Sequence, residues 1–196
     1  MSVPALSVQQ PASEPPAAAR LPLRELLPTG TWRMLVGAGM VAGVVASFTH
    51  FGFIGYAVVG AVFVPTLVLL TAIDVQHRLL PNVIVLPAAV LVGLILAASD
   101  PRTFLGHLAA AAAAGGFFFA FSAFFPGALG MGDTKLVFLL GLALGGRVLG
   151  AIFLAFVAVL VAALYIIAKR GAAARKETIP FGPFLALGGL VAFFLG

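Results

Sequence analysis

The sequence of 196 residues contains no cysteine. This absence excludes disulfides, a thiol nucleophile and any zinc site built from cysteine ligands, and it leaves the redox compartment undetermined. Charged side chains are also scarce, at 9% of the residues, and only six of them are acidic. An acidic residue that borders an apolar segment therefore needs a specific reason, and the search for function starts there.

Apolar side chains are what the sequence has in abundance. They make up 62% of the residues, and the mean hydropathy is +1.19. A soluble domain of this size has to cover itself with polar groups, which this composition does not supply. We therefore predict an all-α fold, a polytopic transmembrane helical bundle. Residues 1–32 are rich in Pro, Ala and Ser and are expected to form a disordered cytoplasmic tail, with the membrane domain at 33–196.

About seven apolar segments follow the tail, against a need for about 20 residues per membrane-crossing helix. The fifth is short, and only Gly145-Gly146-Arg147 separates it from the sixth, so whether these two are separate spans stays open. The expected spans are Met34–Thr49, Gly55–Ile73, Val83–Ala98, Leu105–Phe125, Leu136–Gly146, Val148–Ala168 and Phe181–Gly196.

Basic residues predict the orientation of these spans. With the tail inside, nine of the eleven Lys and Arg residues lie on the cytoplasmic side, and only Arg102 and Arg147 lie outside. Lys and Arg concentrate in cytoplasmic loops of membrane proteins. We therefore predict a multi-pass protein of the cytoplasmic (cell) membrane with its N-terminus in the cytoplasm and its C-terminus outside. The lipid bilayer accounts for the charge of +5, and no nucleic-acid partner is expected.

Two aspartates border apolar spans on the same predicted side. Asp74 ends the second span and Asp133 precedes the fifth, with two membrane crossings between them. The chain therefore leaves and returns to one face, and the two carboxylates can meet there. Two carboxylates that share a water are suited to acid-base chemistry, in which one takes a proton and the other gives one.

The residues after Asp74 are expected to continue its helix for one more turn. His77 and Arg78 would then lie on the same face as Asp74, at i+3 and i+4, until Pro81 ends the helix. A metal site on His77 and Asp74 lacks the three or four ligands that it needs, so no metal is expected.

Glycine and proline mark the other two places where the backbone is irregular. Pro126-Gly127 and Gly130-x-Gly132 are expected to turn the chain tightly and to bring Asp133 close to whatever occupies the site. Pro180-Phe181-Gly182-Pro183 interrupts the start of the last span. Irregular backbone at this depth is tolerated only where protein covers it or a wet cavity borders it.

At these residues the chain resembles the prepilin peptidases, which are membrane aspartic proteases of the GxGD type. Three blocks in order carry the resemblance: Ile73-Asp74 with Leu80-Pro81-Asn82, then Gly130–Leu136, then Pro180–Ala186. The resemblance covers roughly residues 55–190 and implies that Asp74 and Asp133 are catalytic. Around them we expect residues that bind substrate or shape the site. These are Arg78, Pro81, Asn82, Gly130, Gly132, Lys135, Pro180, Gly182 and Pro183.

The resemblance implies an endopeptidase that cleaves the leader of type IV prepilins or prepilin-like pseudopilins at the cytoplasmic face. The substrate it implies has a short basic leader, a glycine at the cut and an apolar helix beyond it. Many members also carry a methyltransferase domain with paired Cys-x-x-Cys zinc ligands. Without cysteine, this chain resembles the short, protease-only kind, so neither a zinc ion nor any other cofactor is expected. The particular pilin, the machine served and the oligomeric state stay open.

Other functions remain open from the sequence. A proton-coupled small-solute transporter also combines broken helices with carboxylates, but it needs access from both faces and usually shows an internal repeat. A non-catalytic membrane assembly protein would leave the carboxylates without a purpose. They could also be helix-end groups that pair with Arg78 and Lys135.

Overall fold

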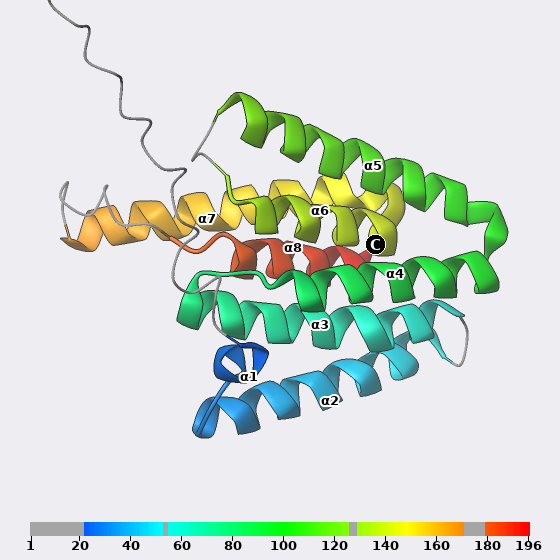
Figure 1. The fold of residues 1–196 in the computed structure, drawn as a ribbon, viewed down its shortest axis with the longest axis horizontal. Helices are drawn as coiled ribbons and strands as arrows, with labels where there is room; N and C mark the ends of the chain where they lie inside the picture. Colours follow the sequence, from blue (N-terminus) through cyan, green and yellow to red (C-terminus); the bar gives the residue numbers. More distant parts are fainter. Residues whose placement is uncertain (1–21, 53–54, 126–128, 171–178) are drawn as a thin grey trace, which may run out of the picture.

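The computed structural model describes residues 22–52, 55–125, 129–170 and 179–196 (Figure 1). All regular structure in these ranges is helical, which confirms the all-α prediction. Most of the predicted tail lies outside the described residues, so the division at residue 32 stays a prediction. The helices are α1 (Leu23–Leu26), α2 (Thr31–Phe51), α3 (Gly55–His77), α4 (Asn82–Ser99), α5 (Pro101–Phe124), α6 (Met131–Leu144), α7 (Val148–Arg170) and α8 (Gly182–Leu195).

The helices identify a multi-pass membrane protein by length and composition. Five stretches of the described chain are long and apolar enough to cross a membrane, and one of them is the 40-residue stretch Met131–Arg170. A 3-10 turn at Gly145–Arg147 divides that stretch into α6 and α7. Gly145 has φ 59°, a left-handed conformation that favours glycine, and the chain reverses there (Figure 1). The fifth and sixth predicted segments are therefore separate helices.

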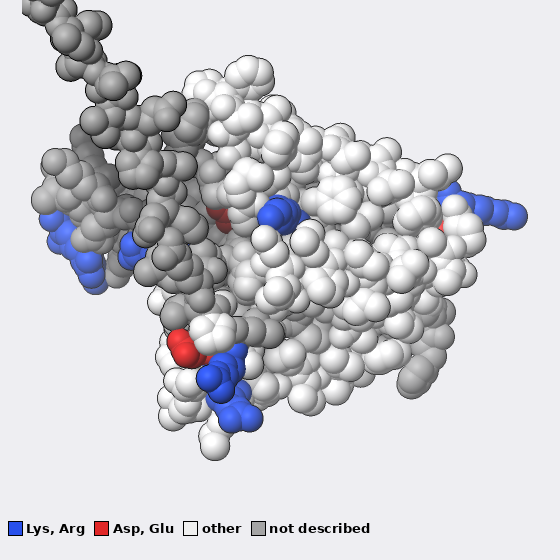
Figure 2. All heavy atoms as spheres, in the orientation of Figure 1, with Lys and Arg blue, Asp and Glu red and all other residues white. Residues whose placement is uncertain are grey.

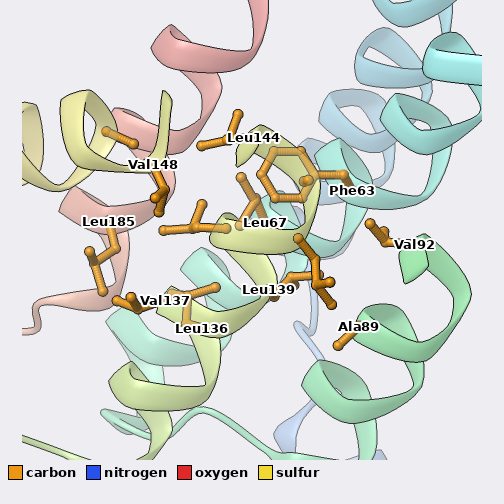
Figure 3. Packing of buried hydrophobic residues seen from close by; sticks show 14 of the residues in the cluster. Phe63, Leu67, Ala89, Val92, Leu136, Val137, Leu139, Leu144, Val148 and Leu185 are labelled. Carbon is orange, nitrogen blue, oxygen red and sulfur yellow. The ribbon is translucent and has the colours of Figure 1, made fainter. Parts of the chain in front are cut away.

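Helix α6 lies at the centre of the bundle. Its side chains from Leu136 to Leu144 are buried, apart from the half-buried Phe138. Figure 3 shows how residues of α3, α4, α7 and α8, among them Leu67, Val92 and Leu185, converge on this helix. An apolar helix of only 14 residues is thus enclosed by its neighbours, so its N-terminal turn is held in place by packing from several sides.

Small residues allow the helices to approach closely. A Cβ at Gly141 would meet the backbone of Ala111 on α5, and a Cβ at Gly188 would meet the backbone of Ala151 on α7. A Cβ at Gly60 would lie 2.5 Å from the Ser47 hydroxyl of α2. Association of helices in lipid depends on such backbone contact, because lipid tails are as apolar as the side chains. These glycines serve packing between helices.

Polar side chains hold the end of the bundle at which α6 stops. The Arg147 guanidinium donates to the Tyr56 hydroxyl at 2.8 Å, and this hydroxyl donates to the Ala143 carbonyl at 2.9 Å. The network satisfies a carbonyl that the last turn of a helix leaves without an intrahelical partner. At the same end Asp100 caps α5, and hydrogen bonds from Thr103 hold the pKa of the Asp100 carboxyl below its usual range.

Most basic residues of the described chain gather at the opposite end. Figure 2 shows clusters of Lys and Arg there and few elsewhere on the visible face. By position in the helices, Arg33 lies in the first turn of α2, Arg78 follows α3, and Lys169 and Arg170 end α7. Arg20, Arg175 and Lys176 of the predicted cytoplasmic set lie outside the described residues. The segregation of charge by end is as expected, and the side of the membrane that each end faces stays a prediction.

Candidate active site

Asp74 lies in the last turn of α3 and is buried, with 6% of its surface exposed. The helix ends three residues later, at His77, and not at Pro81 as the sequence suggested. Arg78 adopts φ 53°, and its backbone N–H donates to the Asp74 carbonyl at 2.8 Å. A left-handed residue stops a right-handed helix at a cost of about 1–2 kcal/mol for a residue with a Cβ. Arg78 thus leaves the helix, and its charge acts on Asp74 from the turn.

The side chain of Asp74 binds the start of α8. The Gly182 backbone N–H donates to Asp74 Oδ2 at 3.1 Å. The first N–H groups of a helix lack intrahelical partners and carry partial positive charge, so a carboxylate is favoured there. Pro183 lies within the first two positions of α8, where a missing N–H costs nothing. The Pro-Phe-Gly-Pro segment is therefore a helix start that the buried carboxylate caps.

Asp133 occupies the first turn of α6, three residues after the N-cap Gly130. The Gly130 backbone N–H bonds to the Asp133 carboxylate, which is the reciprocal half of a capping box. The expectation of a tight turn at Gly130-x-Gly132 is wrong, because the helix already includes Met131 and Gly132. Gly132 serves close packing instead: a Cβ there would lie 2.8 Å from Leu80 Cβ. The predicted turn at Pro126-Gly127 lies outside the described residues.

Asp74 and Asp133 line one cavity of about 380 Å³. The two carboxyl groups interact electrostatically across it. Elements that are distant in sequence enclose the cavity: the end of α3, the start of α6, the middle of α7 and the segment before α8. The lining residues are Asp74, Arg78, Leu129, Gly130, Asp133, Phe156, Val159, Ile179, Pro180 and Phe181. A larger cavity of about 810 Å³ lies between α4, α5 and α6, but neither aspartate lines it.

Asn82 and Lys135 form a second contact near the site. Lys135 Nζ donates to Asn82 Oδ1 at 2.7 Å, which joins the start of α4 to the first turn of α6. Neither residue lines the cavity with the aspartates. Pro81 is the N-cap of α4 and accepts hydrogen bonds from the N–H groups of Ile84 and Val85. These predicted site residues therefore support the site from outside the cavity.

Several residues of the site carry no signal in the sequence. Phe156 and Val159 line the cavity from α7, yet they stand in a continuous apolar run. Leu80 packs against Gly132 and looks like any interfacial leucine. Thr134 is 93% buried, and its Oγ1 has no hydrogen-bond partner among the described residues. A threonine next to Asp133 could have been noticed, but only the structure shows that its hydroxyl is unsatisfied.

The arrangement suits a water held between two carboxylates. One carboxylate can take a proton from the water, and the other can donate to a carbonyl oxygen. Lys135 bonds to Asn82 and not to Asp133, which weakens the reading of the pair as simple helix-end charges. Among the described residues no group of three or more His, Asp or Glu could hold a metal ion.

Fold and site together define a class: a multi-pass helical membrane protein with two carboxylates paired in a cavity at one end of the bundle. The model of the type IV leader peptidase family matches residues 61–167, more than half of the chain. This chain belongs to that family. The matched segment runs from α3 to α7 and includes Asp74 and Asp133.

Several curated relatives are named prepilin leader peptidase/N-methyltransferase. The chain is 30% identical to the one from Xanthomonas campestris pv. campestris, over 96% of the chain and 74% of the relative. It is 30% identical to that from Bacillus subtilis, over 69% of the chain and 54% of the relative. It is 34% identical to that from Pseudomonas aeruginosa, over 82% of the chain and 57% of the relative.

The chain thus spans about half the length of the Bacillus subtilis and Pseudomonas aeruginosa relatives. The sequence contains no cysteine and therefore no Cys-x-x-Cys zinc ligands. No solved structure matches the chain.

Proposed function

We propose that this protein is an aspartic endopeptidase that removes the leader peptide of type IV prepilins or pseudopilins. The observation that carries the proposal is the pairing of Asp74 and Asp133 in one cavity. Membership of the type IV leader peptidase family supports it. The names of the relatives support a prepilin as the substrate. The same names include a second activity, methyl transfer, which we do not assign to this chain.

Hydrolysis in this cavity needs no covalent intermediate. The ionised carboxylate takes a proton from the bound water, which attacks the scissile carbonyl, while the protonated carboxyl donates to the carbonyl oxygen and later protonates the leaving amine. The two groups titrate as a unit, so base and acid are roles of the pair. Arg78, which lines the cavity, supplies positive charge beside Asp74 and can donate hydrogen bonds to carbonyl groups of the substrate backbone.

The membrane orientation follows from the charge distribution. The end that carries the aspartates also carries Arg33, Arg78, Lys169 and Arg170. By the positive-inside rule this end faces the cytoplasm, so the N-terminus is inside and the C-terminus outside. Cleavage at the cytoplasmic face would leave the apolar helix of the substrate in the lipid.

The test is cleavage of a co-expressed prepilin by Asp74→Asn and Asp133→Asn variants. An amide is nearly isosteric with the carboxyl but neither takes nor supplies the catalytic proton, so each variant should lose cleavage at least about a hundredfold. Membrane levels and thermal unfolding in detergent should stay near those of the unmodified protein. Near wild-type cleavage by both variants would refute the proposal.

Transport is the rival function, and the structure offers it less support. A carrier has to open its site to both faces in turn. Both aspartates here lie at one end of the bundle, and the opposite end of α6 is held by the bonds among Arg147, Tyr56 and Ala143. Uptake of a solute by protein-containing vesicles under a proton gradient, lost in Asp74→Asn, would favour the carrier.

A further inference from the structure

An apolar groove with a volume of about 810 Å³ runs along α4, α5 and α6, and it is larger than the cavity that holds the aspartates. We call it the α4–α5 groove. Figure 1 shows α4 and α5 meeting near their connection and diverging toward the end at which α6 begins. The side chains that line it include Val90, Gly93 and Leu94 on α4 and Leu108, Gly116 and Phe119 on α5. The lining also includes Thr134 and Lys135 near the start of α6, so the groove extends to the end of the bundle that carries the aspartates.

Residue spacing in the groove matches what a helix needs in a partner. Ala89, Gly93 and Ala97 recur every fourth position on α4, so one strip of this helix is free of bulk. A strip of small residues lets another helix approach closely in a membrane. Inside the bundle such glycines touch a neighbouring helix, but a Cβ at Gly93 or Gly116 would meet nothing within 4 Å. Ala89 packs in the core of the bundle, whereas Gly93 and Gly116 leave open space in the groove that the described chain does not fill.

Thr134 gives the groove an uncharged polar side chain, next in sequence to Asp133. It lines the groove, is 93% buried, and its Oγ1 has no hydrogen-bond partner among the described residues. The first N–H groups of any helix need an external acceptor. The Thr134 side chain lies in the wall of the groove, so rotation of its hydroxyl toward a helix in the groove would give the first turn of that helix an acceptor. Asp133, the next residue, lines the catalytic cavity.

We propose that the α4–α5 groove holds the apolar helix of the substrate that follows the scissile bond. The inference rests on the proposed function and adds the place where the substrate is recognised. The helix begins beside Thr134, and the peptide bond before it then has to pass around the first turn of α6 to the separate cavity that Asp133 lines. Lys135, bonded to Asn82, borders the same end of the groove. Recognition is then by apolar shape, and a range of pilin-like helices fits.

The first test compares two substrates in membranes: a full prepilin, and a peptide that spans the leader and the cut but lacks the helix. Gly93→Leu and Gly116→Leu put side chains into the groove where the protein itself leaves open space. Each should lower kcat/KM for the full prepilin at least about tenfold and leave that for the peptide within about twofold, because only the former loses its docking contacts. Gly150→Leu, in open space on α7 outside the groove, is the control and should change neither.

The outcomes separate the two proposals. If the unmodified protein cleaves neither substrate, or Asp74→Asn still cleaves both, the proposed function fails. If Gly93→Leu and Gly116→Leu cleave the full prepilin like the unmodified protein, only the groove proposal fails. Equal loss on both substrates would also contradict it, because selective loss is what docking of the helix requires.

A second measurement does not depend on activity. The chain has no cysteine, so a single cysteine is a clean probe. Leu94→Cys in the groove and Leu149→Cys on α7 are both exposed, at 62% and 71%. In an Asp74→Asn background, a prepilin with one cysteine in its apolar helix should form a disulfide with Leu94→Cys and not with Leu149→Cys, since the bond needs Cα atoms within about 7 Å. A groove that holds only lipid chains would give no disulfide at either position, and this would overturn the proposal.

Discussion

The backbone N–H of Gly182 binds the carboxylate of Asp74 across 108 positions of sequence. This bond joins the last turn of α3 to the first turn of α8. The first N–H groups of α8 have no intrahelical acceptor, and the buried Asp74 carboxylate requires hydrogen-bond donors. The bond between them satisfies both groups. The position of one of the two paired carboxyl groups therefore depends on the docking of the last helix.

The contact makes Gly182 the most sensitive glycine of the site. A Cβ there would lie 2.6 Å from Asp74 Oδ2 and 3.0 Å from Cγ. Gly182→Ala should push the carboxylate out of place and lower kcat by about tenfold or more, because small misplacements of reacting groups are costly. Prepilin cleavage in membranes measures it. Gly150→Ala, with open space around it, is the control; equal rates in the two variants would show that the contact does not position Asp74.

Substitution of Gly132 should lower the stability of the protein, because Gly132 packs closely against Leu80. A Cβ at Gly132 would lie 2.8 Å from Leu80 Cβ, and overpacking of this kind costs about 1–3 kcal/mol. Thermal unfolding in detergent should show the loss for Gly132→Ala. Adding Leu80→Gly removes the opposing Cβ, so the double-mutant cycle should show favourable coupling. Leu80→Ala retains that Cβ, so its cycle with Gly132→Ala should show little coupling energy. Equal coupling energies in the Leu80→Gly and Leu80→Ala cycles would contradict the contact.

The two aspartates should behave as one unit. If Asp74 and Asp133 hold the same water, removing either carboxyl already removes the reaction, and the second change has nothing left to remove. The double variant with Asp74→Asn and Asp133→Asn should therefore cleave a prepilin about as slowly as either single variant. A time course with excess enzyme gives the three rates. Additive losses, with the double variant slower by the product of both, would mean that the residues act separately.

The bond between Lys135 and Asn82 should stabilise the junction of α4 and α6. Net contributions of hydrogen bonds are about 0.5–1.5 kcal/mol, and Asn82 is exposed, so a value at the low end is expected. Asn82→Ala and Lys135→Met should each lower the free energy of unfolding, and the double variant should lose less than their sum. A strictly additive cycle in detergent would show that the 2.7 Å contact contributes nothing.

Arg78 combines a charge and an unusual backbone conformation, and two variants separate them. Arg78→Gly and Arg78→Ala both remove the guanidinium, but only glycine adopts φ 53° without strain. The Gly variant should be more stable than the Ala variant by about 1 kcal/mol, while both lose the same share of cleavage. Thermal unfolding and a cleavage assay give both answers. If Ala equals Gly in stability, the turn rearranges and Arg78 does not end α3 as described.

The fold could be predicted from the sequence because apolar segments indicate membrane-spanning helices and basic loops indicate how the helices are connected. Separation of the fifth and sixth segments needed the structure, since it depends on the left-handed Gly145. The meeting of Asp74 and Asp133 followed from counting crossings. The hydrogen-bond partner of Asp74 could not be predicted in this way, because Gly182 lies 108 positions away in sequence. Which backbone N–H meets the carboxylate depends on how α8 docks.

The errors have a common physical cause. The sequence suggested that glycine turns the chain at Gly130-x-Gly132, whereas Gly132 is helical and makes room for Leu80. Glycine permits unusual dihedrals and also close approach, and composition alone does not distinguish these uses. The end of α3 was placed too late for a similar reason: Arg78 has a Cβ and gives no sign of a left-handed conformation.

The shortness of α6 and α8 ties the reaction to the thickness of the surrounding bilayer. Each has 14 residues, about 21 Å of helix, against a hydrocarbon layer of about 30 Å. Arg147, which follows α6, favours the interface at the far end. The end of α6 and α8 that carries Asp133 and Gly182 then lies below the membrane surface. The bilayer has to become thinner there for water to reach the two aspartates. Lipids with longer acyl chains should therefore deepen the recess and slow turnover, and shorter ones should relieve it.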